Sequence, residues 1–183
     1  MSAKRPKTNQ VRIIGGQWRR RNLHFPDVAG LRPTPDRVRE TLFNWLGQRL
    51  DGLRCLDLFA GSGALGFEAA SRGAREVVMV ERDRQALAAL AGNRDLLGAT
   101  QVSLVAADGL SWLAGEAGRF DLIFLDPPFG SDLLPAALAQ AATRLAPEGK
   151  IYAEFGVRPD LEGWHVLREG RAGLSHFCLL EPA

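Results

Sequence analysis

Apolar runs alternate with amphipathic segments along most of the chain. Runs typical of buried strands lie at 53–59, 76–81, 102–107, 120–125 and 150–155. Between them, apolar residues recur at helical spacing at about 63–72, 83–97, 109–116 and 132–145. Strands and helices that alternate at this length are joined by right-handed crossovers. The pattern therefore predicts an α/β fold with a doubly wound, mostly parallel sheet.

The end of the chain departs from this alternation. Residues 164–167 and 174–180 are apolar runs, and the polar link between them, Glu169-Gly-Arg-Ala-Gly, is too short to hold a crossover helix. Strands joined by so short a link pair in antiparallel fashion. We therefore expect an antiparallel C-terminal hairpin on the edge of the sheet.

The beginning of the chain carries a third pattern. The segments Val11–Ile14 and 17–25 flank a Gly-Gly pair, which predicts two short strands around a turn. Apolar residues then recur at helical spacing across 36–50, which predicts an amphipathic helix. Thr34 is placed to cap this helix, and Pro35 suits its first position.

Composition places the chain among globular proteins. Its 183 residues are 46% hydrophobic, which suits one domain; we expect residues 1–50 to extend a sheet domain formed by residues 51–183. There is no apolar stretch of about 20 residues and no signal-peptide pattern, so we expect a cytoplasmic protein with no membrane partner. Cys55 and Cys178 lie in apolar runs without metal-ligand spacing, so we expect reduced thiols and no metal. We also expect a monomer.

The small net charge of +2 hides an uneven distribution. Residues 1–39 contain ten basic and two acidic residues, a net of +8, and the remainder has a net of −6. A solvated tail would explain this, but so would a surface that binds a polyanion. Trp18, His24 and Phe25 are interleaved with the arginines, and arginine both pairs with phosphate and stacks on bases, which favours nucleic acid. The candidate RNA-binding residues are Arg12, Arg19, Arg20, Arg21, Arg32 and Arg37.

A glycine-rich loop, Asp57-Leu-Phe-Ala-Gly-Ser-Gly-Ala-Leu-Gly, follows the first strand of the predicted sheet. It contains the GxGxxG spacing of dinucleotide-binding loops, and Glu81 ends the next strand 20 residues after Gly61. Asp57 would face a pyrophosphate there, and like charges at such a distance cost about 1–4 kcal/mol. S-adenosylmethionine brings an ammonium and a sulfonium instead, which favours it over NAD. The length also leaves no room for the substrate domain expected of a dehydrogenase.

Ligands of open α/β sheets bind at the carboxyl ends of the strands, and the cofactor assignments follow from that rule. We expect Gly61 and Gly63 to allow close approach to the backbone, and Asp57 to balance the methionine end. Glu81 would accept hydrogen bonds from the ribose hydroxyls. Asp108, which ends the third strand, would accept from the adenine amine. For Glu81 and Asp108 the alternative is an ordinary solvated acid.

The fourth strand ends in Asp126-Pro-Pro-Phe129. A rigid turn is one explanation. Methylation of an exocyclic amine is another, because the lone pair of that amine is delocalised into the base and must be positioned before it can react. Asp126 and the Pro127 carbonyl can accept from its two N–H groups and aim the lone pair at the methyl carbon. The two prolines hold these acceptors still. Phe129 can stack on the base, worth about 1–3 kcal/mol, once the base is unpaired.

Three alternatives remain beside amine methylation of RNA. Methylation at carbon 5 of a pyrimidine needs a thiolate, but Cys55 opens the first strand and Cys178 lies in the edge hairpin. A DNA adenine-N6 methyltransferase can use the same tetrapeptide, but it normally needs a segment that reads bases in a duplex. A catalytically silent RNA-binding protein would have no need to keep both the tetrapeptide and the cofactor residues.

Five stretches of the chain together resemble one known family. They are Arg12-Ile-Ile-Gly-Gly-Gln-Trp-Arg, the run from Arg32 to Leu46 that begins Arg-Pro-Thr-Pro-Asp-Arg, the loop from Asp57 to Ala74, Val80-Glu81, and Asp126-Pro-Pro-Phe. Over about residues 10–181 the chain is similar to the bacterial 16S ribosomal RNA guanine-N2 methyltransferases of the RsmD type. The two N-terminal stretches carry most of the specificity, since many amine methyltransferases share the others.

This resemblance implies a class I S-adenosylmethionine-dependent methyltransferase fold, which is Rossmann-like. It implies formation of N2-methylguanosine at one guanine of 16S rRNA, in assembled or assembling 30S particles. By matching position, the guanine is held by Asp126, Pro127 and Phe129. The cofactor is held by Asp57, Gly61, Gly63, Glu81 and Asp108. Arg32 and Thr34 would line the entrance.

Overall fold

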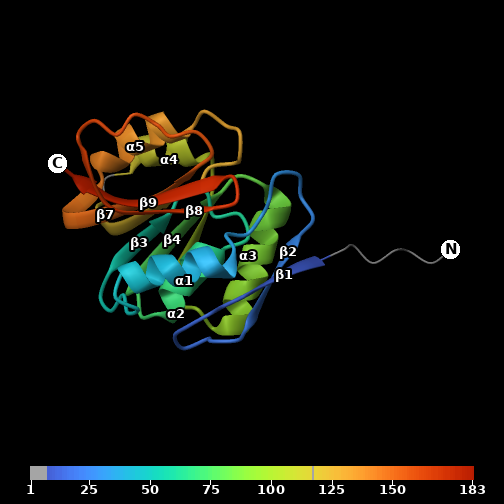
Figure 1. The fold of residues 1–183 in the computed structure, drawn as a ribbon. Coiled ribbons are helices and arrows are strands. Elements are labelled where there is room, and N and C mark those ends of the chain that lie inside the picture. Colours follow the sequence, from blue (N-terminus) through green and yellow to red (C-terminus); the bar gives the residue numbers. More distant parts are fainter. Residues whose placement is uncertain (1–7, 117) are drawn as a thin grey trace.

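Five parallel strands form the centre of the fold. A computed structural model describes residues 8–116 and 118–183, so Lys4, Arg5 and Lys7 of the basic N-terminal segment lie outside the described residues. The parallel strands are β3 (Arg54–Asp57), β4 (Glu76–Glu81), β5 (Val102–Ala106), β6 (Phe120–Leu125) and β7 (Leu145–Phe155). They lie in the order β5-β4-β3-β6-β7, so the direction of winding reverses between β3 and β6 (Figure 1). The doubly wound sheet predicted from the alternation is confirmed.

The C-terminal strands complete this sheet as a hairpin. Strand β8 (Trp164–Ala172) pairs antiparallel with β9 (Ser175–Pro182), and β9 pairs antiparallel with β7. The sheet thus has seven strands, with β5 and β8 at its edges. The predicted edge hairpin is confirmed, with β9 rather than β8 next to the parallel strands.

Helices cover both faces of the sheet. On one face lie α1 (Asp36–Trp45), α2 (Ala64–Ser71) and α3 (Arg84–Leu97), and on the other lie α4 (Gly109–Gly115) and α5 (Leu134–Ala142) (Figure 1). Each face has its own apolar core: Phe43, Phe67 and Tyr152 are fully buried under the first layer, and Leu113 and Ile123 under the second. The expected helix over 36–50 ends early, because the backbone turns left-handed at Gly47 and Gln48.

The N-terminal hairpin consists of β1 (Thr8–Arg12) and β2 (Asn22–Pro26), and it packs on α3. The prediction that the second strand begins at residue 17 is wrong. The N–H groups of Gln17 and Trp18 donate to the backbone oxygen and the hydroxyl of Ser71, at 2.7 and 2.9 Å, so this segment docks on the end of α2. Gly16 makes the docking possible: its φ is +76°, and a Cβ there would lie 1.9 Å from the Ser71 oxygen.

A buried ion-pair network joins the N-terminal segments to the sheet domain. The side chain of Glu68, on α2, is fully buried and accepts from the N–H groups of Ile14 and Gly15 at 3.0 and 2.8 Å. It also pairs with Arg39 at 3.1 Å and with Arg72 at 3.0 Å. Both carboxylate oxygens are therefore occupied, and two of the four donors belong to the chain before α1.

Arg39 carries this network onward to the loop before α1. Its guanidinium, also fully buried, donates to the backbone oxygens of Arg12 at 2.8 Å and Thr34 at 3.0 Å. In the sequence Arg39 belongs to the basic N-terminal segment, but in the structure its side chain is buried and contributes nothing to a basic surface. The network thus fixes the hairpin and the segment around Thr34 relative to α2.

Replacing Glu68 by Gln should destabilise the protein strongly. The variant leaves the guanidiniums of Arg39 and Arg72 buried without a full counter-charge, which costs about 3–5 kcal/mol. Urea unfolding measures the destabilisation. The matched control is Asp51→Asn, which breaks the exposed pair with Arg49 and should leave the free energy of unfolding close to wild type. Equal effects of the two substitutions would contradict the anchoring role of Glu68.

Candidate active site at the carboxyl edge of the sheet

Four acids that the sequence singled out lie at one edge of the sheet. Asp57 and Glu81 end β3 and β4, and Asp108 and Asp126 follow β5 and β6. Asp57 is in register with Met79 on one side and Phe124 on the other, at the point where the winding reverses. Open α/β sheets bind their ligands at this switch point. The topology thus brings together acids that are widely separated in the sequence.

Asp57 is a buried carboxyl group at the centre of this edge. Its side chain is 1% exposed, and its Oδ2 accepts from the Gly66 N–H at 3.0 Å. Burial raises the pKa of Asp57 to about 7; the Gly66 N–H opposes the rise, and the charge of Glu81 adds to it. These groups include no cation, so the site favours a positively charged ligand beside Asp57.

Glu81 holds the glycine-rich loop against β4. Its Oε2 accepts from the Gly61 N–H at 2.8 Å, and its Oε1 from the Asp83 N–H at 2.9 Å. The side chain is half-buried and each oxygen keeps a further lone pair. The acid can therefore organise the loop and still accept from a ligand.

The two expected cofactor glycines have different reasons to be glycine. Gly63 is the N-cap of α2 with φ +81°, and a Cβ there would meet Leu90 at 2.6 Å and Phe67 at 2.7 Å. Internal packing therefore requires Gly63. At Gly61 a Cβ would meet nothing closer than Leu31, at 3.9 Å, so the space beside the loop is open at this position.

Asp108 is exposed and caps α4. Its Oδ2 accepts from the backbone N–H and the hydroxyl of Ser111, both at 3.0 Å. These hydrogen bonds lower the pKa of Asp108, which is therefore ionised. Capping explains an acid at this position without a ligand, although the side chain stands on the same edge as the other three.

Asp126 follows β6 and is held by a hydroxyl from a distant loop. The Thr34 Oγ1 donates to its Oδ2 at 3.2 Å. The sequence predicts that Thr34 caps the first helix, but Pro35 occupies the cap position and no side chain bonds to the helix end. That prediction is wrong because the hydroxyl is turned toward Asp126 instead. Burial, then the charges of Glu154 and Asp57, raise the pKa of Asp126 well above its usual value.

Glu154 and Tyr152 belong to this site, and the sequence reasoning missed them. Both lie near the end of β7, and the Tyr152 hydroxyl donates to Glu154 Oε2 at 3.1 Å. Burial raises the pKa of Glu154, while hydrogen bonds with Tyr152, Thr34 and Asp126 oppose the rise. The available signal was an acid near the end of the fifth parallel strand, because each of the other four strands has an acid at its end or just after it.

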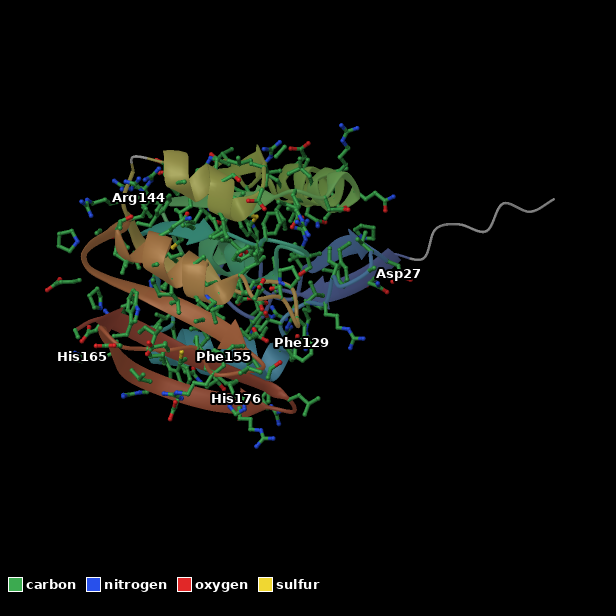
Figure 2. The ribbon with its side chains drawn as sticks, turned by 90° about the horizontal axis from the view of Figure 1, so that it is seen from above. Asp27, Phe129, Arg144, Phe155, His165 and His176 are labelled. Atoms are coloured by element: carbon green, nitrogen blue, oxygen red, sulfur yellow. The ribbon has the colours of Figure 1, made fainter. Side chains whose placement is uncertain are left out.

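Phe129 stands at the mouth of the site. Its side chain is 73% exposed, and its ring lies against the backbone of Gly156, where a Cβ would come within 3.1 Å of it. Phe155 and His176 lie on the same side of the molecule, and their rings stack with centroids 5.9 Å apart (Figure 2). Phe129 thus offers an open aromatic face beside Asp126.

The candidate RNA-binding arginines fall into two groups. Arg12, Arg32 and Arg37 are exposed around the start of α1, near Thr34. Arg12 pairs with Asp36 at 3.6 Å, and both line a cavity of about 380 Å³ between the hairpin and the loop before α1. This group borders the carboxyl edge.

The second group, residues 19–21, lies at the opposite edge. The preceding residues dock on Ser71, where α2 ends, and Arg21 donates to the Leu96 oxygen, where α3 ends, at 3.3 Å. The eight residues of α2 separate the two edges by about 12 Å. Of the aromatic residues between the arginines, Trp18 and Phe25 are buried, so they offer no stacking face to a base.

The described part of the chain contains no candidate metal site. Within residues 8–116 and 118–183, no group of three His, Cys, Asp or Glu side chains could hold a metal ion. In the same residues, no helix combines the length and apolar character needed to cross a membrane. The candidate site consists of acids, one exposed aromatic ring and flanking arginines.

Known proteins resemble this chain over nearly its whole length. The model of the family described as Conserved hypothetical protein 95 matches residues 11–181. The chain is 45% identical over 180 residues to Ribosomal RNA small subunit methyltransferase D of Escherichia coli K12, covering 95% of this chain and 91% of that protein. It is 39% identical over 181 residues to the protein of the same name from Haemophilus influenzae, covering 94% of each.

Solved structures give the same picture. A putative methyltransferase, yhhF, from Escherichia coli superposes with a TM-score of 0.85 at 43% identity, covering 95% of this chain and 98% of that chain. A Thermus thermophilus 16S rRNA N2 G1207 methyltransferase (RsmC), in complex with AdoMet and guanosine, has a TM-score of 0.73 at 26% identity, covering 97% of this chain and 50% of that chain. The expected class I methyltransferase fold is confirmed. By the family model and by these identities, the chain belongs to the family of the small-subunit ribosomal RNA methyltransferases D.

Proposed function

We propose that this protein transfers a methyl group from S-adenosylmethionine to the N2 amine of one guanine in 16S rRNA of the small ribosomal subunit. One observation carries the proposal: the Asp126-Pro-Pro-Phe129 turn stands beside buried Asp57, because Asp57 is in register with Phe124, two residues before Asp126. The turn that suits an amine therefore lies next to the buried acid that suits a cation. The relatives support the substrate class, and the Thermus relative, described with AdoMet and guanosine, supports the two ligands.

The residues of the carboxyl edge suit S-adenosylmethionine. When bound, it supplies a methyl carbon on a positively charged sulfur. Asp57 would face its cationic methionine end, because the pKa of Asp57 is raised by burial and the groups that shift it include no cation. Glu81, whose oxygens keep free lone pairs, would accept from the ribose hydroxyls. Asp108 would accept from the adenine amine at the rim, and the open space at Gly61 would admit the ligand.

The tetrapeptide would act on the other reactant. Asp126 and the Pro127 carbonyl would accept from the two N–H groups of the guanine amine, which draws the nitrogen toward sp³ geometry and aims its lone pair at the methyl carbon. The locked φ angles of Pro127 and Pro128 keep these acceptors in place. The open face of Phe129 would stack on the extruded base.

The test is transfer of labelled methyl groups to the proposed substrate. With tritiated S-adenosylmethionine and 30S particles from a strain that lacks this gene, we expect one labelled guanine, as N2-methylguanosine, located by nuclease digestion and chromatography. The control is Asp126→Ala, which removes the acceptor and should reduce the rate at least about 100-fold while cofactor binding by calorimetry stays close to wild type. Label on DNA adenine, or on nothing, would defeat the proposal.

The raised pKa of Asp57 predicts an unusual dependence of stability on pH. A carboxyl group whose pKa is raised by folding stabilises the folded state at low pH, and this contribution disappears as the pH rises toward 7. Asp57→Asn should therefore make the cofactor-free protein more stable than wild type at pH 8. Measured by urea unfolding, the free energy of unfolding of the variant minus that of wild type should be about 2–3 kcal/mol larger at pH 8 than at pH 5. The same variant should bind S-adenosylmethionine more weakly. A difference between the two proteins that does not change with pH would contradict the assigned state of Asp57.

Both arginine groups are proposed to bind RNA, and salt dependence can separate them. Neutralising Arg19, Arg20 and Arg21 should weaken RNA binding and flatten the dependence of log K on log salt, by about 0.7 for each RNA phosphate that is no longer neutralised. Neutralising Arg32 and Arg37 should have the same kind of effect. The control is Arg168→Ala, an exposed arginine on the edge strand β8. A group whose removal leaves the slope at the control value is merely solvated.

A further inference from the structure

The ends of β6 and β7 place two carboxyl groups side by side. The two strands are parallel neighbours, and Leu125 is in register with Ala153. The next residue on each strand is an acid, Asp126 and Glu154, so the two side chains leave neighbouring strands, about 4.8 Å apart, on the same face of the sheet, and each shifts the pKa of the other. Two carboxyl groups this close cannot both ionise without a cost.

Two hydroxyl groups hold this pair in place. Thr34 donates to Asp126 Oδ2 at 3.2 Å, and Tyr152 donates to Glu154 Oε2 at 3.1 Å. The Tyr152 ring is fully buried and packs against Phe124 and Phe177, with centroids 6.3 and 6.4 Å away, so its hydroxyl cannot swing aside. Thr34 also bonds with Glu154, so the pair is held as a unit by two hydroxyl groups.

The titratable groups around the pair are acids and a neutral thiol. Asp57, on β3, adds a like charge that raises the pKa of Asp126. Cys178, on β9, lies beside Tyr152, and burial raises its pKa to about 11, so it is neutral. The described groups that shift the pKa of Asp126 or Glu154 include no arginine, lysine or histidine. A shared proton is the remaining way to relieve the repulsion.

We propose that Glu154 is a positioning residue whose negative charge beside Asp126 makes Asp126 a stronger acceptor for the substrate amine, and that the pair shares the proton that the amine releases. This inference rests on the proposed function, in which Asp126 accepts from that amine. Glu154 itself does not touch the amine. It acts through its negative charge, which disfavours ionisation of Asp126 and so increases its basicity.

The pair would accept the proton that the amine loses during methyl transfer. The amine lone pair forms the new N–C bond, and the electrons of the C–S bond return to sulfur, which becomes a neutral thioether. The methylated nitrogen is left with a positive charge and loses a proton. Ionised Asp126 takes this proton while the N–H electrons stay on nitrogen, and hydrogen bonding to Glu154 spreads the proton over both carboxyl groups. Water receives it when the product leaves.

Two substitutions should shift the pH dependence in opposite directions. Glu154→Gln removes the like charge, so the pKa of Asp126 falls and the acidic limb of the kcat profile should move down by about 1–2 pH units. The plateau kcat should fall about tenfold, because Asp126 becomes a weaker base. Tyr152→Phe removes a hydrogen bond that stabilises ionised Glu154, so the pair holds its proton more tightly and the limb should move up.

A titration without cofactor or RNA separates this inference from the proposed function. Carbon-13 NMR of the carboxyl groups in the wild-type protein should show Asp126 and Glu154 titrating together in two steps, with Asp126 assigned by its absence in Asp126→Asn. In Glu154→Gln, Asp126 should titrate in one step at lower pH. The matched control is Glu181→Gln on β9, which should leave the carboxyl titration of Asp126 and the kcat profile unchanged.

The outcomes are distinct. Independent titration of the two groups, or a Glu154→Gln profile that loses amplitude without moving along the pH axis, would overturn the sharing of a proton and leave Glu154 a packing residue. Coupled titration in a protein that labels no guanine would keep the pair and overturn the proposed function. Circular dichroism and urea unfolding of each variant establish that the titrating protein is folded.

Discussion

The buried carboxylate of Glu68 is the interaction on which the site depends. Within the described network it bonds at once to the hairpin connection, to α1 through Arg39 and to the end of α2 through Arg72. Arg39 in turn fixes the Thr34 backbone, and Thr34 donates to Asp126. A chain of hydrogen bonds thus runs from the middle of α2 to the acid at the mouth of the site. The N-terminal segment is therefore part of the site's construction.

The carboxyl edge gathers negative charge that the fold leaves uncompensated. Asp57, Asp126 and Glu154 are each shifted toward the protonated form by burial, and the groups that shift them are backbone N–H groups, hydroxyls and other acids. Such an arrangement costs stability in the empty protein, as sites that bind a charged ligand often do. A cationic ligand would relieve that cost when it binds, so that binding and ionisation of the acids would be coupled. The same cluster of buried acids therefore destabilises the empty protein and suits the proposed cationic ligand.

The sequence predicted the sheet well, because burial on both faces leaves continuous apolar runs that can be read directly. The bounds of β4 and β6 agree with the expected runs, and the acids at strand ends meet as the topology requires. What failed depends on contacts between distant segments. Nothing near Arg39 indicates that it turns inward to Glu68, 29 positions away, and the hydroxyl of Thr34 finds Asp126 92 positions away. The sequence offers Trp18 for stacking on a base because its docking on Ser71 has no local signal. Glu154 had a signal only in its position near the end of the fifth parallel strand, and nothing in the residues around it marks it as part of the site.

The placement of residues 19–21 at the far end of α2 bears on the size of the RNA that the protein would recognise. If these arginines and the group around Arg32 both contact phosphates, the backbone of the RNA must pass both edges of the sheet domain, about 12 Å apart along α2. A single extruded nucleotide with its two neighbours would fill the mouth of the site and leave the distal arginines idle. A folded RNA surface would contact both groups. The arginines at one edge would then bind only RNA with the correct tertiary fold, while the base is modified at the other edge.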